Sequence, residues 1–86
     1  MRTLVKGMFF RGAEVVELVN TLEIDTELRV EHEPENEYDS YACQVFYEDI
    51  HIGYVAKEDS MFWAEDAPHT AKITARVDKY IEIESV

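Results

Sequence analysis

The chain has 86 residues, of which 47% are apolar or aromatic, and 19 acidic residues against 8 basic ones give a net charge of −11. This length predicts one domain, residues 1 to 86, with a small core, and the apolar fraction excludes a disordered chain. The acidic excess argues against a broad basic surface of the kind that most nucleic-acid binders carry. No stretch approaches the roughly 20 apolar residues of a membrane span, and the first residues do not form a signal peptide.

The first third of the chain reads as strand, helix and strand. An apolar run from Thr3 to Phe10 predicts a first strand that ends at the turn Arg11-Gly12. A helix is expected over Glu14 to Leu22, where the apolar residues follow one helical face: Val15, Leu18, Val19 and Leu22. Alternation from Leu28 to Glu33 predicts a half-buried strand that runs into Pro34.

The middle of the chain predicts a β-hairpin. Its strands are Ala42 to Tyr47 and Ile50 to Val55, joined by a turn at Glu48-Asp49. One face of the first strand would hold Cys43, Val45 and Tyr47. Gly53 inside the second strand indicates either a bulge or a close approach by another backbone or a ligand.

The last third predicts a short helix and two strands. The helix begins at Asp59-Ser60 and carries Met61, Phe62 and Trp63, which are expected to pack on the core or form a lid. Strict alternation from Thr70 to Asp78 predicts a strand with four inward residues, namely Ala71, Ile73, Ala75 and Val77. A final strand follows from Tyr80 to Ile83. The predicted fold class is therefore mainly β with one or two short helices, in a small barrel.

The acidic loop that contains Tyr38 is the most distinctive segment. Pro34 stops the preceding strand, and the short side chains of Asn36 and Asp39 can bond to nearby backbone and shape a turn. Tyr38 lies between them. Such a loop presents an aromatic face, a carboxylate and free backbone amides, which suits a ligand clamp. The alternative is a well-formed turn with an ordinary surface tyrosine.

Neither an enzyme nor a metal or cofactor protein is predicted. The single cysteine, Cys43, is expected to be a buried apolar side chain whose pKa is raised, and with no possible disulfide partner it indicates an intracellular, cytoplasmic protein. The histidines His32, His51 and His69 show no metal-ligand spacing. Only three glycines occur, so a glycine-rich phosphate loop is excluded.

The loop and the hairpin together resemble the HIRAN domain family, in the form of a small standalone bacterial or phage-type member. That family's signature is a strand ending in Glu-Pro, a loop reading Asn-x-Tyr-Asp, then an alanine with an apolar strand, and finally Ile-Gly-Tyr-Val. The matching positions are Glu33-Pro34, Asn36, Tyr38-Asp39, Ala42, Val45 and Ile52-Gly53-Tyr54-Val55. The resemblance implies a small β-barrel with attached helices.

The resemblance also implies a function. HIRAN domains occur in fork-remodelling, helicase-like ATPases and as small modules, and eukaryotic members look like readers of the free 3′ end of single-stranded DNA. Carried over by position, the DNA-binding residues become Phe10, Tyr38, Asp39, Tyr54 and Lys57. The implied protein is a non-catalytic DNA-binding module that recognises 3′-hydroxyl ends and is associated with DNA repair or replication. Tyr54 with Gly53 could equally be required by the barrel alone.

Two departures from the family leave a second function open. Phe9 stands where DNA-binding members carry arginine, and only Lys57 remains of the two basic residues that usually follow the Ile-Gly-Tyr-Val segment. The acidic stripe, defined as Glu31, Glu33, Glu35, Glu37 and Asp39, would suit a protein-interaction module or DNA mimic that binds a basic surface on a nucleic-acid-processing enzyme. The two functions differ in whether Arg2, Lys6, Arg11 and Lys57 converge beside Tyr38.

Overall fold

The computed structural model describes all 86 residues as a closed six-stranded barrel with strand order β1-β4-β3-β2-β5-β6. The elements in chain order are β1 (Arg2–Lys6), η1 (Met8–Arg11), α1 (Ala13–Thr21), β2 (Glu27–His32), β3 (Cys43–Tyr47), β4 (Ile50–Val55), η2 (Lys57–Asp59), α2 (Ser60–Glu65), β5 (His69–Val77) and β6 (Tyr80–Ser85), where η denotes a 3₁₀ helix. The predicted fold class, a mainly β barrel with two short helices, is confirmed.

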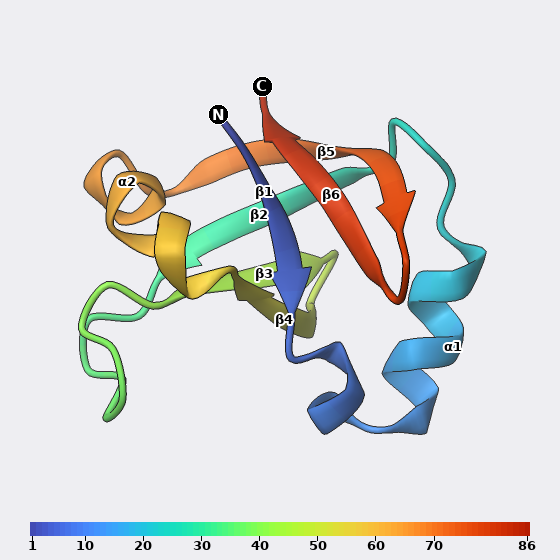
Figure 1. Ribbon diagram of the computed structural model, residues 1–86, viewed down its shortest axis with the longest axis horizontal. Helices are drawn as coiled ribbons and strands as arrows, with labels where there is room; N and C mark the ends of the chain where they lie inside the picture. Colours follow the sequence, from blue (N-terminus) through green and yellow to red (C-terminus); the bar gives the residue numbers. More distant parts are fainter.

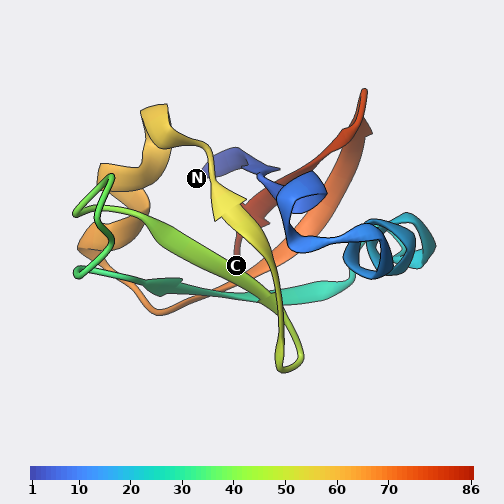
Figure 2. The ribbon, with the colours of Figure 1, turned by 90° about the horizontal axis from the view of Figure 1, so that it is seen from below.

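The barrel closes because β1 pairs antiparallel with both β4 and β6. This arrangement brings the two ends of the chain side by side, and the ammonium group of Met1 donates to Ser85 Oγ at 2.9 Å (Figure 1). The two helices lie at opposite ends of the barrel, α2 beside the loop that joins β2 to β3 and α1 beside the β5–β6 hairpin (Figures 1 and 2).

The core is built from the alternation that the sequence shows. On every strand except β4, which carries a bulge, the buried residues share one parity, among them Val5, Leu28, Val30, Val45, Ile73, Ile81 and Ile83. The helices add Val19 from α1 and Trp63, only 1% exposed, from α2. Each helix therefore covers one end of the barrel, and apolar burial supplies the main stabilisation.

Both structural uses foreseen for Gly53 occur. The pairing of β3 with β4 shifts register between Val45 and Phe46, which leaves Ile52 as the extra residue of a bulge. A Cβ atom on Gly53 would lie 2.6 Å from the carbonyl oxygen of Lys6 and 2.8 Å from Val5 Cγ1. The predicted hairpin with its turn at Glu48-Asp49 is confirmed, and glycine is needed in its second strand because β1 crosses there.

The first strand is shorter than predicted. It ends at Lys6, because Gly7 adopts a left-handed backbone conformation with φ of 78° and turns the chain into η1. Glycine enters this region without steric cost, so the apolar run of Met8, Phe9 and Phe10 leaves the sheet. The expectation of a strand through Phe10 is therefore wrong, and Phe10 lies in a 3₁₀ turn.

The inward face of β5 also differs from prediction. A bulge between Ile73 and Ala75 inserts Thr74 and reverses the alternation that follows it. As a result, Val77 is 42% exposed and Arg76 takes the position opposite the buried Ile81. The Arg76 guanidinium donates to the carbonyls of Val19, at 2.8 Å, and Leu22. The two carbonyls lie at the C-terminal end of α1, where a cation is favourable.

The α2 segment begins at the predicted place but by a different contact. The Asp59 carboxylate accepts from Thr3 Oγ1 at 2.7 Å and makes no capping bond to the helix. Trp63 is buried as predicted, whereas Met61 and Phe62 are 50% and 56% exposed, so of the two predicted roles, core and lid, the core role is wrong for them. The predicted helix over Glu14 to Leu22 and the predicted final strand are confirmed as α1 and β6.

None of the helices is both long and apolar enough to cross a membrane.

Candidate functional site

The loop between β2 and β3 is shaped by one side chain, that of Asn36. Its Oδ1 accepts hydrogen bonds from the backbone amides of Tyr38, at 2.9 Å, and Asp39, at 3.0 Å. This is an Asx-type turn, as the sequence predicted. The two amides that flank the tyrosine are consequently occupied, so the expectation that this loop offers free backbone amides to a ligand is wrong for them.

Glu33 connects the loop to strand β4. Its Oε1 accepts from Asn36 Nδ2 at 2.7 Å and from the Tyr54 hydroxyl at 3.0 Å. Burial, together with the hydrogen bond to Glu33, raises the pKa of Tyr54 above its usual value. The phenol therefore stays protonated, and its hydrogen bond fixes the position of the loop relative to the barrel.

Asp39 connects the same loop to α2. Its Oδ1 accepts from the amide of Tyr41 at 2.9 Å, and its Oδ2 accepts from Ser60 Oγ at 3.0 Å. Ser60 is only 3% exposed. An ionised carboxylate has about four acceptor positions, so Asp39 keeps room for further donors while these bonds hold it in place.

These contacts form a pocket of about 250 Å³ between the loop, β4 and η2. Of the residues predicted to bind DNA, four line it: Tyr38, Asp39, Tyr54 and Lys57. The remaining wall is formed by Asn36, Ala42 and Val55. Tyr38 is 88% exposed and stands at the pocket with its ring free. The pocket therefore brings together an aromatic face and a carboxylate from the loop and the ammonium group of Lys57 from η2.

Phe10, the fifth predicted residue, does not line this pocket. It lines a different groove, although η1 starts close by, since a Cβ on Gly7 would lie 4.0 Å from Tyr54 Cδ2. The Tyr54 ring thus stands between the pocket and the turn that carries Phe10.

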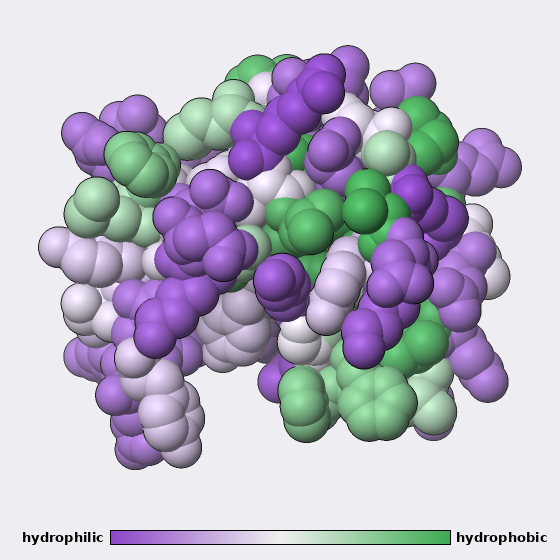
Figure 3. All heavy atoms as spheres, viewed as in Figure 1, coloured by the Kyte–Doolittle hydropathy of each residue, from purple (hydrophilic) through white to green (hydrophobic).

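The other basic residues do not converge beside Tyr38. Arg2 pairs with Glu84 at 3.1 Å, Lys6 lies 3.9 Å from Glu58, and Arg11 donates to the carbonyl of His51 at 3.3 Å. Lys57 alone brings a positive charge to the pocket. The loop around it projects as a largely hydrophilic segment at the lower left of Figure 3.

The acidic stripe is not a uniform row of free carboxylates. Glu31 pairs with Arg29, while Glu33 and Asp39 accept the loop and helix hydrogen bonds described above. Glu35 and Glu37 are exposed. Three members of the stripe therefore have structural partners, and two face solvent.

The cysteine is buried in the core, and the three histidines form hydrogen bonds with the backbone. Cys43 is fully buried, and burial, followed by the charge of Asp39, raises its pKa to about 11. A thiol in that state is a poor nucleophile, as predicted. Each histidine contacts a backbone carbonyl through Nε2, at distances of 2.7 to 2.9 Å: His32 with Ser40, His51 with Gly53, and His69 with Trp63.

Sequence reasoning missed the residues that hold the pocket in shape. Glu33 was predicted as the end of a strand, Asn36 as part of a turn and Ser60 as a helix start, but none as a support for Tyr54 or Asp39. The spacing of Glu33 and Asn36 across Pro34 was a usable signal, because residues three apart in a turn can bond directly. Ser60 gave no such signal, because its partner lies 21 residues away.

A family model for the HIRAN domain matches residues 2–79. The chain belongs to the HIRAN domain family. The resemblance carried by the loop and hairpin motifs is thereby confirmed, and the match spans every element of this HIRAN domain up to the turn before β6.

Two solved structures share the fold. A crystal structure of a protein from Lactobacillus plantarum, a structural genomics target, superposes with a TM-score of 0.80 at 20% identity, over 95% of this chain and 85% of that one. The HIRAN domain of human HLTF superposes with a TM-score of 0.71 at 15% identity, over 99% of this chain and 73% of that one. No curated protein sequence matches this HIRAN domain significantly.

Proposed function

We propose that this HIRAN domain is a non-catalytic module that binds the 3′-hydroxyl end of single-stranded DNA in the pocket beside Tyr38. The observation that carries this proposal is the convergence of Tyr38, Asp39, Tyr54 and Lys57 on one cavity. The family membership supports the nucleic-acid ligand, and a role in DNA repair or replication follows from the same membership.

Tyr38 supplies the stacking surface. Its ring is exposed while its backbone is fixed by Asn36, so stacking a terminal base on it costs little ordering. Stacking on an aromatic side chain contributes about 1 to 3 kcal/mol per base and tolerates any base. The pocket is accordingly expected to bind ends without strong sequence preference.

Asp39 supplies the end selectivity. A terminal 3′ hydroxyl can donate to a remaining acceptor position of the Asp39 carboxylate, whose Oδ1 already accepts from Tyr41 and whose Oδ2 accepts from Ser60. A 3′ phosphate has no such proton to donate at neutral pH, and its negative charge repels the carboxylate. The pocket is therefore expected to favour the hydroxyl end.

Lys57 and Phe10 extend the contact along the strand. The Lys57 ammonium pairs with a backbone phosphate as a point charge. Phe10, 89% exposed on the turn beyond Tyr54, would stack on a base that has left the pocket. With one lysine at the site, binding is expected to be weak and to depend only modestly on salt.

A second candidate function is a protein-interaction module or DNA mimic that occupies a basic surface on a nucleic-acid-processing enzyme. The exposed Glu35 and Glu37 beside the pocket, the net charge of −11 and the scattered positions of Arg2, Lys6 and Arg11 favour it. The partners already held by Glu31, Glu33 and Asp39 disfavour it, because a mimic needs a regular row of free charges. The DNA-end function is therefore preferred.

Fluorescence anisotropy of a labelled ten-residue thymidine strand, at low salt, tests the proposal. The 3′-hydroxyl strand is expected to bind at least tenfold more tightly than the 3′-phosphate strand, and Tyr38→Ala should abolish binding. Asp39→Asn should reduce the difference between the two ends. Tyr41→Ala is the matched control, since Tyr41 lies in the same loop, is 47% exposed and does not line the pocket. Equal binding of both ends, or none at high micromolar protein, would refute the proposal.

A further inference from the structure

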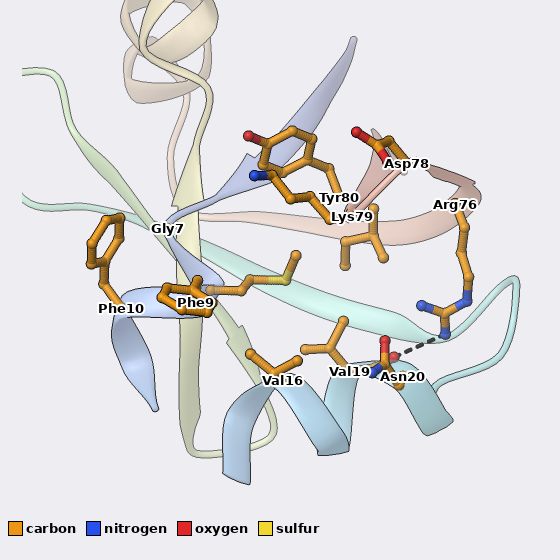
Figure 4. Close-up of a pocket in the computed structure, with 12 residues that line it drawn as sticks. Gly7, Phe9, Phe10, Val16, Val19, Asn20, Arg76, Asp78, Lys79 and Tyr80 are labelled. Carbon is orange, nitrogen blue, oxygen red and sulfur yellow. Dashed lines mark hydrogen bonds between the residues drawn. The ribbon is translucent and has the colours of Figure 1, made fainter. Parts of the chain in front are cut away.

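A second cavity lies at the other end of the barrel, between η1 and α1 on one side and the β5–β6 hairpin on the other. It measures about 280 Å³. Figure 4 shows Phe9 and Val16 on the helical side, with Tyr80 and Lys79 on the hairpin side. We call this cavity the apolar groove. More than half of its lining residues are hydrophobic.

The rim of the groove exposes two adjacent phenylalanines. Phe9 and Phe10 are 81% and 89% exposed, and their rings meet edge to face with centroids 6.0 Å apart. In Figure 4, Phe9 lies beside the cavity and Phe10 stands at its outer edge. Apolar side chains also gather over η1 in the space-filling view (Figure 3). Contiguous exposed aromatic surface next to a cavity is typical of an interaction site.

The charge around the groove differs from that of the rest of the chain. Its lining includes one acid, Asp78, against Arg76 and Lys79, in a protein with more than twice as many acidic as basic residues. Arg76 is occupied by the carbonyls at the end of α1. Lys79 forms no ion pair, and its ammonium lies 5.8 Å from the centre of the Tyr80 ring. The ammonium of Lys6 lies 5.4 Å from the same ring.

We propose that the apolar groove binds a segment of a partner protein that inserts one bulky apolar side chain beside Phe9 and pairs a neighbouring carboxylate with Lys79. The volume of about 280 Å³ lies just below the roughly 300 to 1,000 Å³ of typical small-molecule pockets, and it suits one large side chain. The unpaired Lys79 ammonium can pair with one carboxylate next to the inserted side chain, whereas further acidic residues would be repelled by Asp78 and by the net charge of −11.

Other occupants fit less well. A DNA strand would find no carboxylate held by hydrogen bonds as Asp39 is in the loop pocket, so nothing in the groove would recognise its end. A second copy of the chain would bring another net charge of −11 against this one. The groove lies beside α1, at the opposite end of the barrel from the loop pocket (Figures 1 and 2). The inference does not rest on the DNA-end proposal, because it depends on Phe9 and Lys79, whereas the DNA strand is expected to reach only Phe10 at the outer edge of the groove.

The test is a selection of random dodecapeptides displayed on phage against the immobilised full chain, followed by anisotropy with the selected synthetic peptides. Enriched peptides are expected to share a bulky apolar residue within three positions of Asp or Glu. Phe9→Ser and Lys79→Glu should each weaken their binding at least tenfold, and Tyr38→Ala should leave it unchanged. Phe9 is exposed and Lys79 lies in a hairpin turn, so both variants are expected to fold, which circular dichroism would verify.

Three results would overturn the proposal. The first is that no peptide family is enriched, or that the enriched peptides are Lys-rich and insensitive to Phe9→Ser. The second is a concentration-dependent mass in sedimentation equilibrium that Phe9→Ser removes, which would make a second copy the occupant. The third is that a thymidine strand shifts the backbone amide signals of Val16 and Tyr80 in NMR, which would assign the groove to DNA.

Discussion

The two cavities of this barrel are built on opposite principles. The loop pocket is held by hydrogen bonds that run from Tyr54 through Glu33 and Asn36 to the loop backbone. The apolar groove has no such network at its rim, where Phe9 and Phe10 are left uncovered. The pocket is therefore shaped before any ligand arrives, whereas the groove offers apolar surface that a partner would bury.

Each of the two cavities is lined by one lysine that forms no ion pair. Of the eight basic residues, four form ion pairs, and Arg11 and Arg76 donate to backbone carbonyls. The remaining two are Lys57, which lines the pocket, and Lys79, which lines the groove. On so acidic a surface, affinity for anionic groups depends less on the number of lysines than on where one is left unpaired.

The largest effect is expected from Gly53→Ala, which disturbs both cavities together. The added Cβ would lie 2.6 Å from the Lys6 carbonyl, where β1 crosses β4 just before the chain enters η1. Relief requires the strands to separate, at a cost of about 2 to 3 kcal/mol. Urea unfolding measures it. At Gly12, where φ is 107° but nothing lies within 4 Å, the same substitution should cost only about 1 kcal/mol. Equal costs at both positions would mean that the crossing is not tight.

Asn36→Ala should weaken binding at the loop pocket and leave binding at the apolar groove unchanged. It removes the acceptor of the Tyr38 and Asp39 amides and the donor to Glu33, with a loss of stability of about 1 to 2 kcal/mol. DNA-end binding should fall while peptide binding in the groove persists. Glu37→Ala, an exposed change in the same loop, is the control. If binding at the groove fell equally, the two sites could not be treated as independent.

Charge reversal at the two unpaired lysines should sharpen the comparison. Lys57→Glu is expected to weaken strand binding about tenfold, or about 1.4 kcal/mol, and to leave peptide binding unchanged. Lys79→Glu should have the reverse pattern. Anisotropy with both ligands on both variants gives the full comparison. Equal losses of strand binding in the two variants would indicate a general charge effect instead of two sites.

The smallest effect is expected from protonation of His51, which contacts Tyr54 of the loop pocket and Arg11 of η1. Its ring lies between Phe46 and Tyr54, its carbonyl accepts from Arg11 of η1, and burial, followed by the charge of Arg11, lowers its pKa. Above pH 6.5 the imidazole is neutral in both states. As the pH falls below 6.5 the unfolded chain takes up the proton first. The free energy of unfolding therefore decreases from pH 6.5 down to the lowered pKa of the folded state. Urea unfolding between pH 7.5 and 5 should show a steeper loss than in His51→Phe, and parallel profiles would contradict this.

The sequence predicted the parts of the fold that depend on local alternation. The β3–β4 hairpin, α1 and the barrel class were recovered because apolar period and turn residues agree there. The signature residues also indicated that Tyr38, Asp39, Tyr54 and Lys57 belong together, and the structure brings them to one pocket.

The predictions were wrong where a turn or bulge of the backbone interrupts the alternation of apolar and polar residues along a strand. Gly7 ended β1 inside an apolar run, and the extra residue Thr74 exchanged the faces of Arg76 and Val77. Neither a single left-handed glycine nor a one-residue bulge alters composition, so the apolar pattern still read as continuous strand. The pairing of the basic residues was equally hidden, because Arg2 and Glu84 meet only when the barrel closes.

Closure of the barrel limits how any partner can recognise this protein. Each of the six strands is hydrogen-bonded on both sides, so an extended peptide cannot add itself as a further strand. Recognition must then come from side chains and loops, as in both cavities described above. The same property removes the exposed edges through which β-proteins associate into fibres, and it predicts that concentrated solutions resist amyloid formation until the barrel opens.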